Sequence, residues 1–578
     1  MPNLTFIRIS MGALLLVFFI FLSGCAQPAA SRSKPLVLDM VHHNPGEVRY
    51  ETKYENPRVI RGMGDNGKVY FLFDSPMLAV NWESVDPTIF PQGSPGRAWV
   101  DAKAAEIDAQ QAACKQAGLK VYAMSDLILF PKALVEKFHL ADTFGDPRQP
   151  ETQKYLKLLI GQMFERFPKM DGLVVRIGET YLHDAPYHVG SIKNKTSADE
   201  TIIPLMQLLR EEVCVKRGKE IIFRTWLSFD TKLETYEAVS AAVEPHPNLI
   251  ISVKHCEGDF HRANLFSKVI GSGRHRQIIE VQCAREYEGK GAYPNYVANG
   301  VIEGFEEHRL RPGPGRFGSI GEFARQSPLF AGVWTWSRGG GWEGPYIKNE
   351  LWCDLNVWVM AQWALDPGQS EEAVFNRYAT EKLGLRGDDL SRFRRLCLLS
   401  ASAVVRGRNT TLGDMNPWWT RDQYISRPLL PGDPAALWTK DKYVNRSPLP
   451  QDSAARQRVL SQKDESVAQW GEIVRLAGEI RFRDPAAAEY VITSARYGHG
   501  LFRIYRAVCQ LAAEGVQGDK NRLRAWLSEY DRAWADYRKL AAEHPSCATL
   551  YQEQGSPWGP KPGIDEFIRE CRGRLVSP

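Results

Sequence analysis

The sequence has few cysteines and no concentrated charge, and both absences exclude functions. Its 10 cysteines in 578 residues are scattered, with no Cys-x-x-Cys pair and no His–Cys spacing that suits a metal. The net charge of +5 is small for this length and includes no basic block, so nucleic acid is a poor partner. No glycine-rich phosphate turn follows a strand-like run. We therefore predict no metal, no organic cofactor and no nucleic-acid partner.

The N-terminus predicts export and lipid attachment. Arg8 precedes an apolar run from Met11 to Leu22, and a Leu-Ser-Gly-Cys box follows that ends at Cys25. This order is typical of a bacterial lipoprotein signal. The alternative is an uncleaved membrane helix, but the run is shorter than the ~20 residues that a span needs. We expect residues 1–34 to be signal peptide and tether, with Cys25 anchoring the chain to the periplasmic or outer-membrane surface.

Strand-like and helix-like patterns alternate from about residue 66 to residue 366. Strands this apolar, alternating with helices, favour a parallel sheet buried on both faces. Seven clear strands and an eighth, either Leu36–Met40 or Gly300–Ile302, predict a closed (β/α)8 barrel over residues 35–370. A doubly wound open sheet is the alternative. The seven runs are Val69–Phe73, Val121–Ser125, Leu173–Gly178, Ile221–Thr225, Leu249–Lys254, Ile278–Cys283 and Gly332–Trp336.

Beyond Pro367 the pattern changes to long helices. Residues 371–408 and 453–545 are charged and helix-periodic, so we predict a mainly α-helical C-terminal domain over 371–578. Residues 409–450 between them are rich in Pro, Trp and Asp. A loop of this length is usually functional or disordered. We expect it to fold near the barrel mouth.

Chemically able side chains stand where the predicted strands end, which is where barrel enzymes place their reacting groups. Acids at these ends suit glycoside hydrolysis, which needs one carboxyl as proton donor and a second to activate water or attack. Cations at the same ends suggest an anionic substrate, because Arg binds a carboxylate through two parallel hydrogen bonds. These residues are Arg176, Glu179, Arg224, Lys254, Glu257, Asp259, Arg285 and Glu286.

Two segments that contain these strand-end residues resemble a known family. Lys254-His-Cys-Glu-Gly-Asp-Phe260 followed by Gln282-Cys-Ala-Arg-Glu-Tyr287 is similar to the paired signature of the family 67 α-glucuronidases. The segments Asp171–Glu179 and Ile222–Thr225 are similar to that family's acid-bearing and arginine-bearing strands, and the likeness spans roughly residues 66–370. It departs in lacking the family's large N-terminal β-domain, in having Arg176 where Lys is usual, and in having Arg285 where the family has Gln.

The resemblance implies roles for the residues at the strand ends. Glu179 would be the general acid, and Asp259 and Glu286 would be the carboxylates that activate water in an inverting reaction. Arg176, Arg224 and Lys254 would hold the uronate carboxylate. The structural alternatives are that Glu179 neighbours a helix cap and that Asp259 and Glu286 pair with nearby cations.

Further contacts to the sugar are expected from the signature and from tryptophans. Aromatic rings stack on sugar faces, although they also fill protein cores. Of Trp334 and Trp336, we expect one to fill the barrel and the other to meet the ligand. The predicted substrate-binding residues beyond the three cations are Arg285, Tyr287, Trp336, Trp342 and Trp418.

The sequence therefore predicts a lipid-anchored glycoside hydrolase that removes a terminal uronic acid from oligosaccharides or polysaccharide fragments. One alternative is a barrel exo-glycosidase acting on another sugar, such as a hexosaminidase. Another is a non-catalytic glycan-binding lipoprotein.

Overall fold

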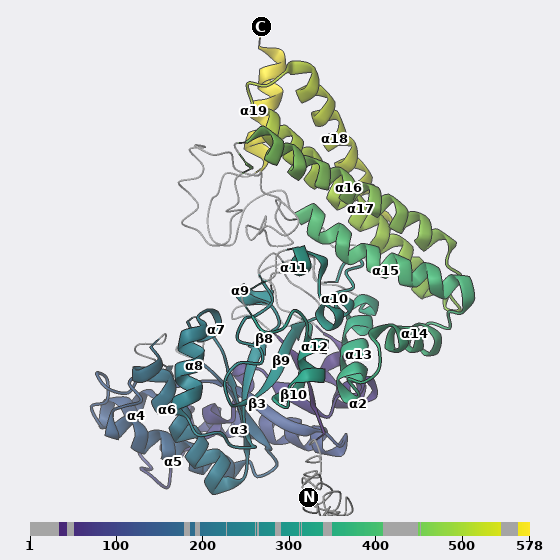
Figure 1. Cartoon of the computed structure of the whole chain (residues 1–578). Helices are drawn as coiled ribbons and strands as arrows, with labels where there is room; N and C mark the ends of the chain where they lie inside the picture. The colour runs from purple at the N-terminus through teal and green to yellow at the C-terminus, as the bar shows by residue number, and fades with distance from the viewer. Residues whose placement is uncertain are drawn as a thin grey trace, which may run out of the picture. The chain divides into compact units, whose positions relative to one another are not determined.

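The computed structural model describes most of the chain after the N-terminal segment (Figure 1). Leu36–Pro578 form one compact unit, and Met1–Pro35 form another. The predicted lipidation site, Cys25, lies outside the described residues. The described residues are 34–42, 51–177, 185–190, 197–226, 228–260, 262, 265–283, 291–310, 313, 315–338, 349–408, 449–450, 452–544 and 564–577.

Eight parallel strands close into a barrel in the order β1-β10-β9-β8-β7-β5-β3-β2, which confirms the predicted (β/α)8 architecture. The eighth strand is the Leu36 segment, whereas Gly300–Ile302 lies inside helix α10 (Ala298–Glu303). The strands are β1 (Leu36–Val41), β2 (Gly67–Tyr70), β3 (Lys120–Asp126), β5 (Gly172–Arg176), β7 (Glu220–Arg224), β8 (Leu249–Lys254), β9 (Arg276–Gln282) and β10 (Phe330–Arg338).

The strands are buried on both faces because helices cover the outside of the barrel while side chains fill the inside. Helix α3 (Pro95–Gln116) begins at Pro95, because Ser94 caps it and Pro95 suits its first turn. The covering helices are α2 (Pro57–Met63), α3, α5 (Pro150–Arg166), α6 (Ile203–Leu209), α8 (Leu233–Ala242), α10, α12 (Ile320–Gln326) and α13 (Leu351–Leu365).

Short elements lie in the connections that follow the strands. Strands β4 (Leu129–Pro131) and β6 (His188–Gly190) pair antiparallel as a separate two-stranded sheet. The short helices are α4 (Lys132–Lys137), α7 (Ser228–Thr231), α9 (Glu257–Phe260) and α11 (Glu306–Leu310).

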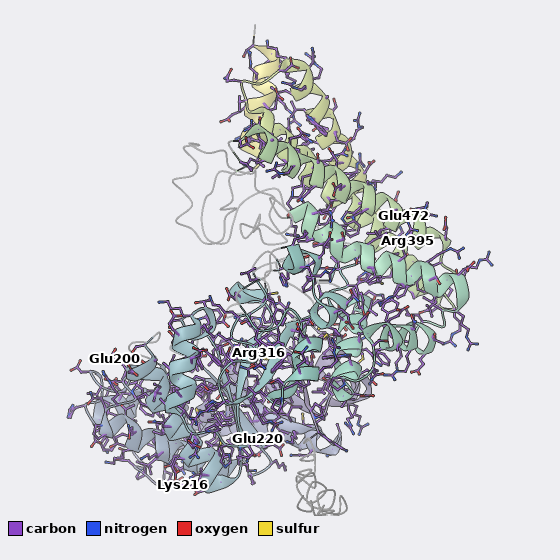
Figure 2. All side chains as sticks on the ribbon, viewed as in Figure 1. Glu200, Lys216, Glu220, Arg316, Arg395 and Glu472 are labelled. Carbon is purple, nitrogen blue, oxygen red and sulfur yellow. The ribbon has the colours of Figure 1, made fainter. Side chains whose placement is uncertain are left out.

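Charged and polar side chains meet at the amino ends of the strands. Glu220 accepts hydrogen bonds from Lys120 Nζ (2.9 Å) and from the Tyr122 hydroxyl. Glu220 is among the labelled side chains in Figure 2. Polar contacts at this end of a (β/α)8 barrel serve stability, so the opposite end is where chemistry is expected.

The C-terminal part is helical, as predicted, and contains no strand among its described residues. Neighbouring helices run alongside one another (Figure 1). An ion pair between Arg395 of α15 and Glu472 of α16 (3.0 Å) lies on their surface (Figure 2). The helices are α14 (Glu371–Glu381), α15 (Gly387–Arg408), α16 (Ser453–Glu479), α17 (Pro485–Glu514), α18 (Lys520–Glu543) and α19 (Ile564–Val576). The predicted domain boundary at residue 370 stays a prediction.

Candidate active site at the carboxyl ends of the strands

The strand register brings the predicted cations onto one face. Residues paired across parallel strands point to the same side, and Arg176 is paired with Asp126 while Lys254 is paired with Glu280. Arg224 on β7 contacts side chains of β3 and β9, each two strands away. Such contacts are possible only inside the barrel. Arg176, Arg224 and Lys254 therefore line the interior at the carboxyl ends of three adjacent strands.

Arg224 is held by a buried acid. Its Nε and Nη2 donate to the two carboxylate oxygens of Glu280, each at 2.8 Å, and the Ser252 hydroxyl donates to the same carboxylate at 2.7 Å. The side chains of Arg224 and Glu280 are 4% and 1% exposed. The remaining nitrogen, Nη1, faces the sulfur of Met124 (3.9 Å). One edge of the guanidinium is therefore committed to the protein.

Arg176 is paired in the same manner with the acid on its neighbouring strand. Its Nε and Nη2 donate to Oδ1 (2.6 Å) and Oδ2 (2.9 Å) of Asp126, and both side chains are buried. Each arginine thus belongs to a bidentate ion pair, which fixes its plane and offsets much of its charge.

Lys254 is the third cation and is surrounded by aromatic rings. Its Nζ lies 3.9 Å from the centre of the Trp226 ring and 5.5 Å from that of Phe260. A desolvated ammonium over an indole face is stabilised by the ring quadrupole. Lys254 is 1% exposed, so its charge acts in a medium of low dielectric.

Trp336 and Trp334 both face the interior, because residues two apart on a strand point to the same side. Trp334 is fully buried, and Trp336 lies nearer the mouth. The His42 ring stacks on Trp336 (4.9 Å, 22° between planes), and the Arg224 guanidinium lies 5.1 Å from its centre. These contacts cover the ring, so its indole N–H is the group left to meet a ligand.

Buried polar atoms near the strand ends that have no hydrogen-bond partner among the described residues include Oε1 of Gln282, Nε1 of Trp226 and Nε1 of Trp336. More than nine in ten buried polar groups in proteins are hydrogen-bonded, so each such atom requires an explanation. Sequence reasoning assigned no role to Gln282 or Trp226. Their position at or just after a strand end was the signal available for both.

Glu257 begins helix α9, shortly after the end of β8, and is a half-buried acid near the mouth. Burial raises the pKa of its carboxyl above the usual value, and Lys268 at 3.7 Å opposes the rise.

The predicted catalytic acids lie largely outside the described residues. Asp259 has its backbone in α9, but its side chain is not described. The other predicted site residues outside the described part are Glu179, Arg285, Glu286, Tyr287, Trp342 and Trp418. The structure therefore brings together Arg176, Arg224, Lys254 and Trp336, and leaves the acid roles as predictions.

The described part of the chain contains neither a metal-binding cluster nor a membrane-spanning helix. There, no three His, Cys, Asp or Glu side chains gather in an arrangement that would hold a metal ion. Among the same residues, no helix combines the length and the apolar character that crossing a bilayer requires.

The comparisons with known proteins identify the fold. Neither protein-family models nor curated protein sequences give a match. Among solved structures, an enzyme of glycoside hydrolase family 138 that targets the pectin rhamnogalacturonan II is similar, with a TM-score of 0.54 at 12% identity. That likeness covers 93% of this chain and 66% of the other, so the chain spans just under two thirds of that enzyme's length.

Two weaker likenesses are to glycoside hydrolase family 84. CpGH84D has a TM-score of 0.39 at 12% identity, covering 94% of this chain and 74% of the other. An O-GlcNAc hydrolase variant from Thermobaculum terrenum has a TM-score of 0.39 at 11% identity, covering 94% of each chain. The likeness to the family 138 enzyme shows the fold alone. The chain is therefore a (β/α)8-barrel protein with a helical C-terminal region.

Proposed function

We propose that this protein is a glycoside hydrolase that removes a terminal acidic sugar, of the uronic acid class, from oligosaccharides or polysaccharide fragments. The observation that carries the proposal is the placement of Arg176, Arg224 and Lys254 on the inside of the barrel, at the carboxyl ends of adjacent strands. Three buried cations at the catalytic end of a barrel suit a substrate that brings its own negative charge.

The ion pairs define how a substrate carboxylate would be held. Asp126 and Glu280 each occupy two N–H donors of an arginine, and a guanidinium has five. The substrate carboxylate would bind to N–H groups of Arg224 that Glu280 does not occupy, beside the Lys254 ammonium. Because the paired arginines cannot swing away, the sugar would be held in one orientation.

The acids supply the reaction in this proposal. Glu179 would protonate the leaving oxygen, and Asp259 and Glu286 would activate water, with inversion at the anomeric carbon. These roles come from the resemblance to the family 67 α-glucuronidases. The similar fold of an enzyme that targets rhamnogalacturonan II makes pectin fragments, which are acidic, a second substrate class to examine.

The direct test is hydrolysis of aldouronic and pectic oligosaccharides by wild type, Glu179→Ala and Glu286→Ala, followed by chromatography of the released sugar. We expect wild type to release a uronic acid and each variant to lose at least about 100-fold in rate, since each removes a proton-transfer group. Equal release by all three proteins would show that the acids are misassigned.

A second variant tests the recognition of charge. Arg224→Ala should raise KM and lower kcat on an acidic sugar and change little on a neutral one. The matched control is Arg262→Ala, which breaks a different buried ion pair, with Glu307 (2.7 Å).

If N-acetylated or neutral sugars are the ones cleaved, a hexosaminidase-like activity replaces the proposal. Binding without turnover would instead favour a glycan-binding protein.

We also propose that the chain is attached to the bacterial envelope through Cys25. The order of Arg8, the apolar run and Cys25 supports this. Labelling with a radioactive fatty acid should mark wild type but not Cys25→Ala. An unlabelled wild-type chain would contradict the attachment.

A further inference from the structure

We propose that Gln282, assisted by the indoles of Trp226 and Trp336, reads a free hydroxyl of the bound sugar and so selects an acidic sugar that is unsubstituted at that position. This inference rests on the proposed function. It adds a residue that determines which acidic sugar is bound. Gln282 is 3% exposed, and its Oε1 has no hydrogen-bond partner within the described part of the chain.

The three groups belong to one region of the barrel mouth. Gln282, the last residue of β9, is in register with Trp336 of β10. Phe260 lies between Trp336 and Lys254: its ring is 5.3 Å from the Trp336 ring and 5.5 Å from the Lys254 ammonium. Lys254 in turn lies over Trp226. The unpartnered atoms therefore belong to residues that neighbour the cations at the strand ends.

The atoms differ in what they demand from a ligand. Gln282 Oε1 accepts only, so it needs a hydroxyl or an N–H, and an O-methyl or deoxy position leaves it unsatisfied. The indole N–H groups of Trp226 and Trp336 donate only, so an ether oxygen satisfies them as well as a hydroxyl does. Discrimination therefore falls on Gln282.

Unpartnered indole N–H groups alone would not carry this inference, since Trp363 and Trp470 also have them in the core. A second buried glutamine with an unpartnered Oε1, Gln111, lies on the outer helix α3 at 2% exposure. Gln111 lies away from the three cations at the strand ends, and it provides the matched control.

The experiment measures binding of the methyl α-glycosides of D-glucuronate and D-galacturonate, and of their 2-, 3- and 4-deoxy forms, by calorimetry. The proteins are wild type, Gln282→Met and Gln111→Met, with thermal unfolding to verify the fold. We expect Gln282→Met to weaken binding of the preferred parent glycoside about 10- to 100-fold, the usual effect of leaving a buried polar group unpaired. For one deoxy form the two proteins should bind alike, because the hydroxyl that Gln282 reads is already gone. Gln111→Met should bind every ligand as wild type does.

Two results would overturn the inference while leaving the proposed function in place. In one, wild type binds and releases a uronate but Gln282→Met behaves like Gln111→Met. In the other, Gln282→Met weakens every deoxy form by the same factor as the parent, which indicates a merely structural role. A wild type that neither binds nor releases any acidic sugar would overturn both proposals.

Discussion

At the scale of single residues, the barrel mouth keeps its charges in fixed pairs. Glu280 accepts three hydrogen bonds, two from Arg224 and one from Ser252. Taking a carboxylate out of water costs several kcal/mol, and such a network offsets that cost only when every member is satisfied. The pairs therefore position the arginines more than they stabilise the fold.

Removing one member of the pair should be far more damaging than removing a surface partner. We expect Glu280→Ala to lower the free energy of unfolding by about 3–5 kcal/mol, because it leaves Arg224 buried and unpaired. Glu83→Ala removes a half-exposed partner of Arg97 and should cost less than about 1 kcal/mol. Urea unfolding of both variants measures the difference, and equal losses would contradict the account.

His188 gives the fold a dependence on pH. Its ring is fully buried, Nδ1 faces the Pro186 carbonyl at 2.8 Å, and burial lowers its pKa to about 4. Between pH 6.5 and 4 the unfolded chain binds a proton that the folded chain does not, so stability is lost as the pH falls through this window. The loss approaches roughly 3 kcal/mol, at about 1.36 kcal/mol per pKa unit.

The check is urea unfolding at pH 7.5 and pH 4.5 for wild type and His188→Gln. The variant should lose less stability on acidification than wild type by about 2 kcal/mol. Identical pH dependence in the two proteins would mean that His188 is protonated as readily in the folded chain as in the unfolded one.

The sequence indicated which residues stand at strand ends but not their partners. Arg176, Arg224 and Lys254 were found because each lies at or near the end of an apolar run. Asp126 and Glu280 were not recognised as their counterions, because that pairing depends on strand register and on reach across an intervening strand. No local pattern encodes either property.

At the scale of elements, helix α17 of the C-terminal part ties down two connections at the barrel mouth. The Tyr490 hydroxyl lies 3.0 Å from the Gly291 carbonyl and 3.3 Å from the Asn349 carbonyl. Gly291 and Asn349 are the first described residues after the connections that leave β9 and β10. One hydroxyl thus holds the ends of both.

We expect Tyr490→Phe to lower kcat about 3- to 10-fold with a smaller change in KM, the effect of about 1 kcal/mol of lost positioning. The measurement is steady-state kinetics on the sugar that wild type releases. Tyr378→Phe on α14 is the control for removing a hydroxyl among these helices, and it should leave kcat unchanged. Equal kcat in Tyr490→Phe and wild type would show that the tie has no part in catalysis.

The strands were predictable because apolar β-branched runs mark buried parallel strands whatever their partners. The residues at which helices begin were harder to predict. Ser94, which caps α3, and the following Pro95 mark the start of this helix in the sequence, whereas apolar periodicity alone does not. The Tyr490 contacts join residues 199 and 141 positions apart, so only the tertiary structure reveals them.

At the scale of the whole molecule, buried polar contacts cross between the barrel segments and the C-terminal helices. Arg262 donates to the Ala401 carbonyl at 2.7 Å, and the Tyr296 amide donates to the Ser400 hydroxyl at 3.1 Å. The Tyr296 hydroxyl donates to Glu371, which Arg394 also binds. Breaking such contacts leaves buried groups without partners.

A chain that ends at residue 370 should therefore not fold independently. It would lose Glu371, Ser400 and the rest of these partners, and it would expose the apolar surface that the helices cover. We expect residues 35–370 to aggregate in size-exclusion chromatography, whereas residues 35–578 should elute as a single species. A monodisperse short chain that unfolds cooperatively would support the predicted domain boundary instead.

The central claim is that the barrel mouth recognises a negatively charged sugar and cleaves its glycosidic bond. It is tested most directly with one set of oligosaccharides in two forms, with the terminal uronic acid intact and with its carboxyl reduced to a primary alcohol. We expect wild type to hydrolyse the acidic form with a kcat/KM at least about 100-fold above the reduced form, because the reduced sugar brings no negative charge to the cations at the strand ends. Equal kcat/KM on the two forms would contradict the claim.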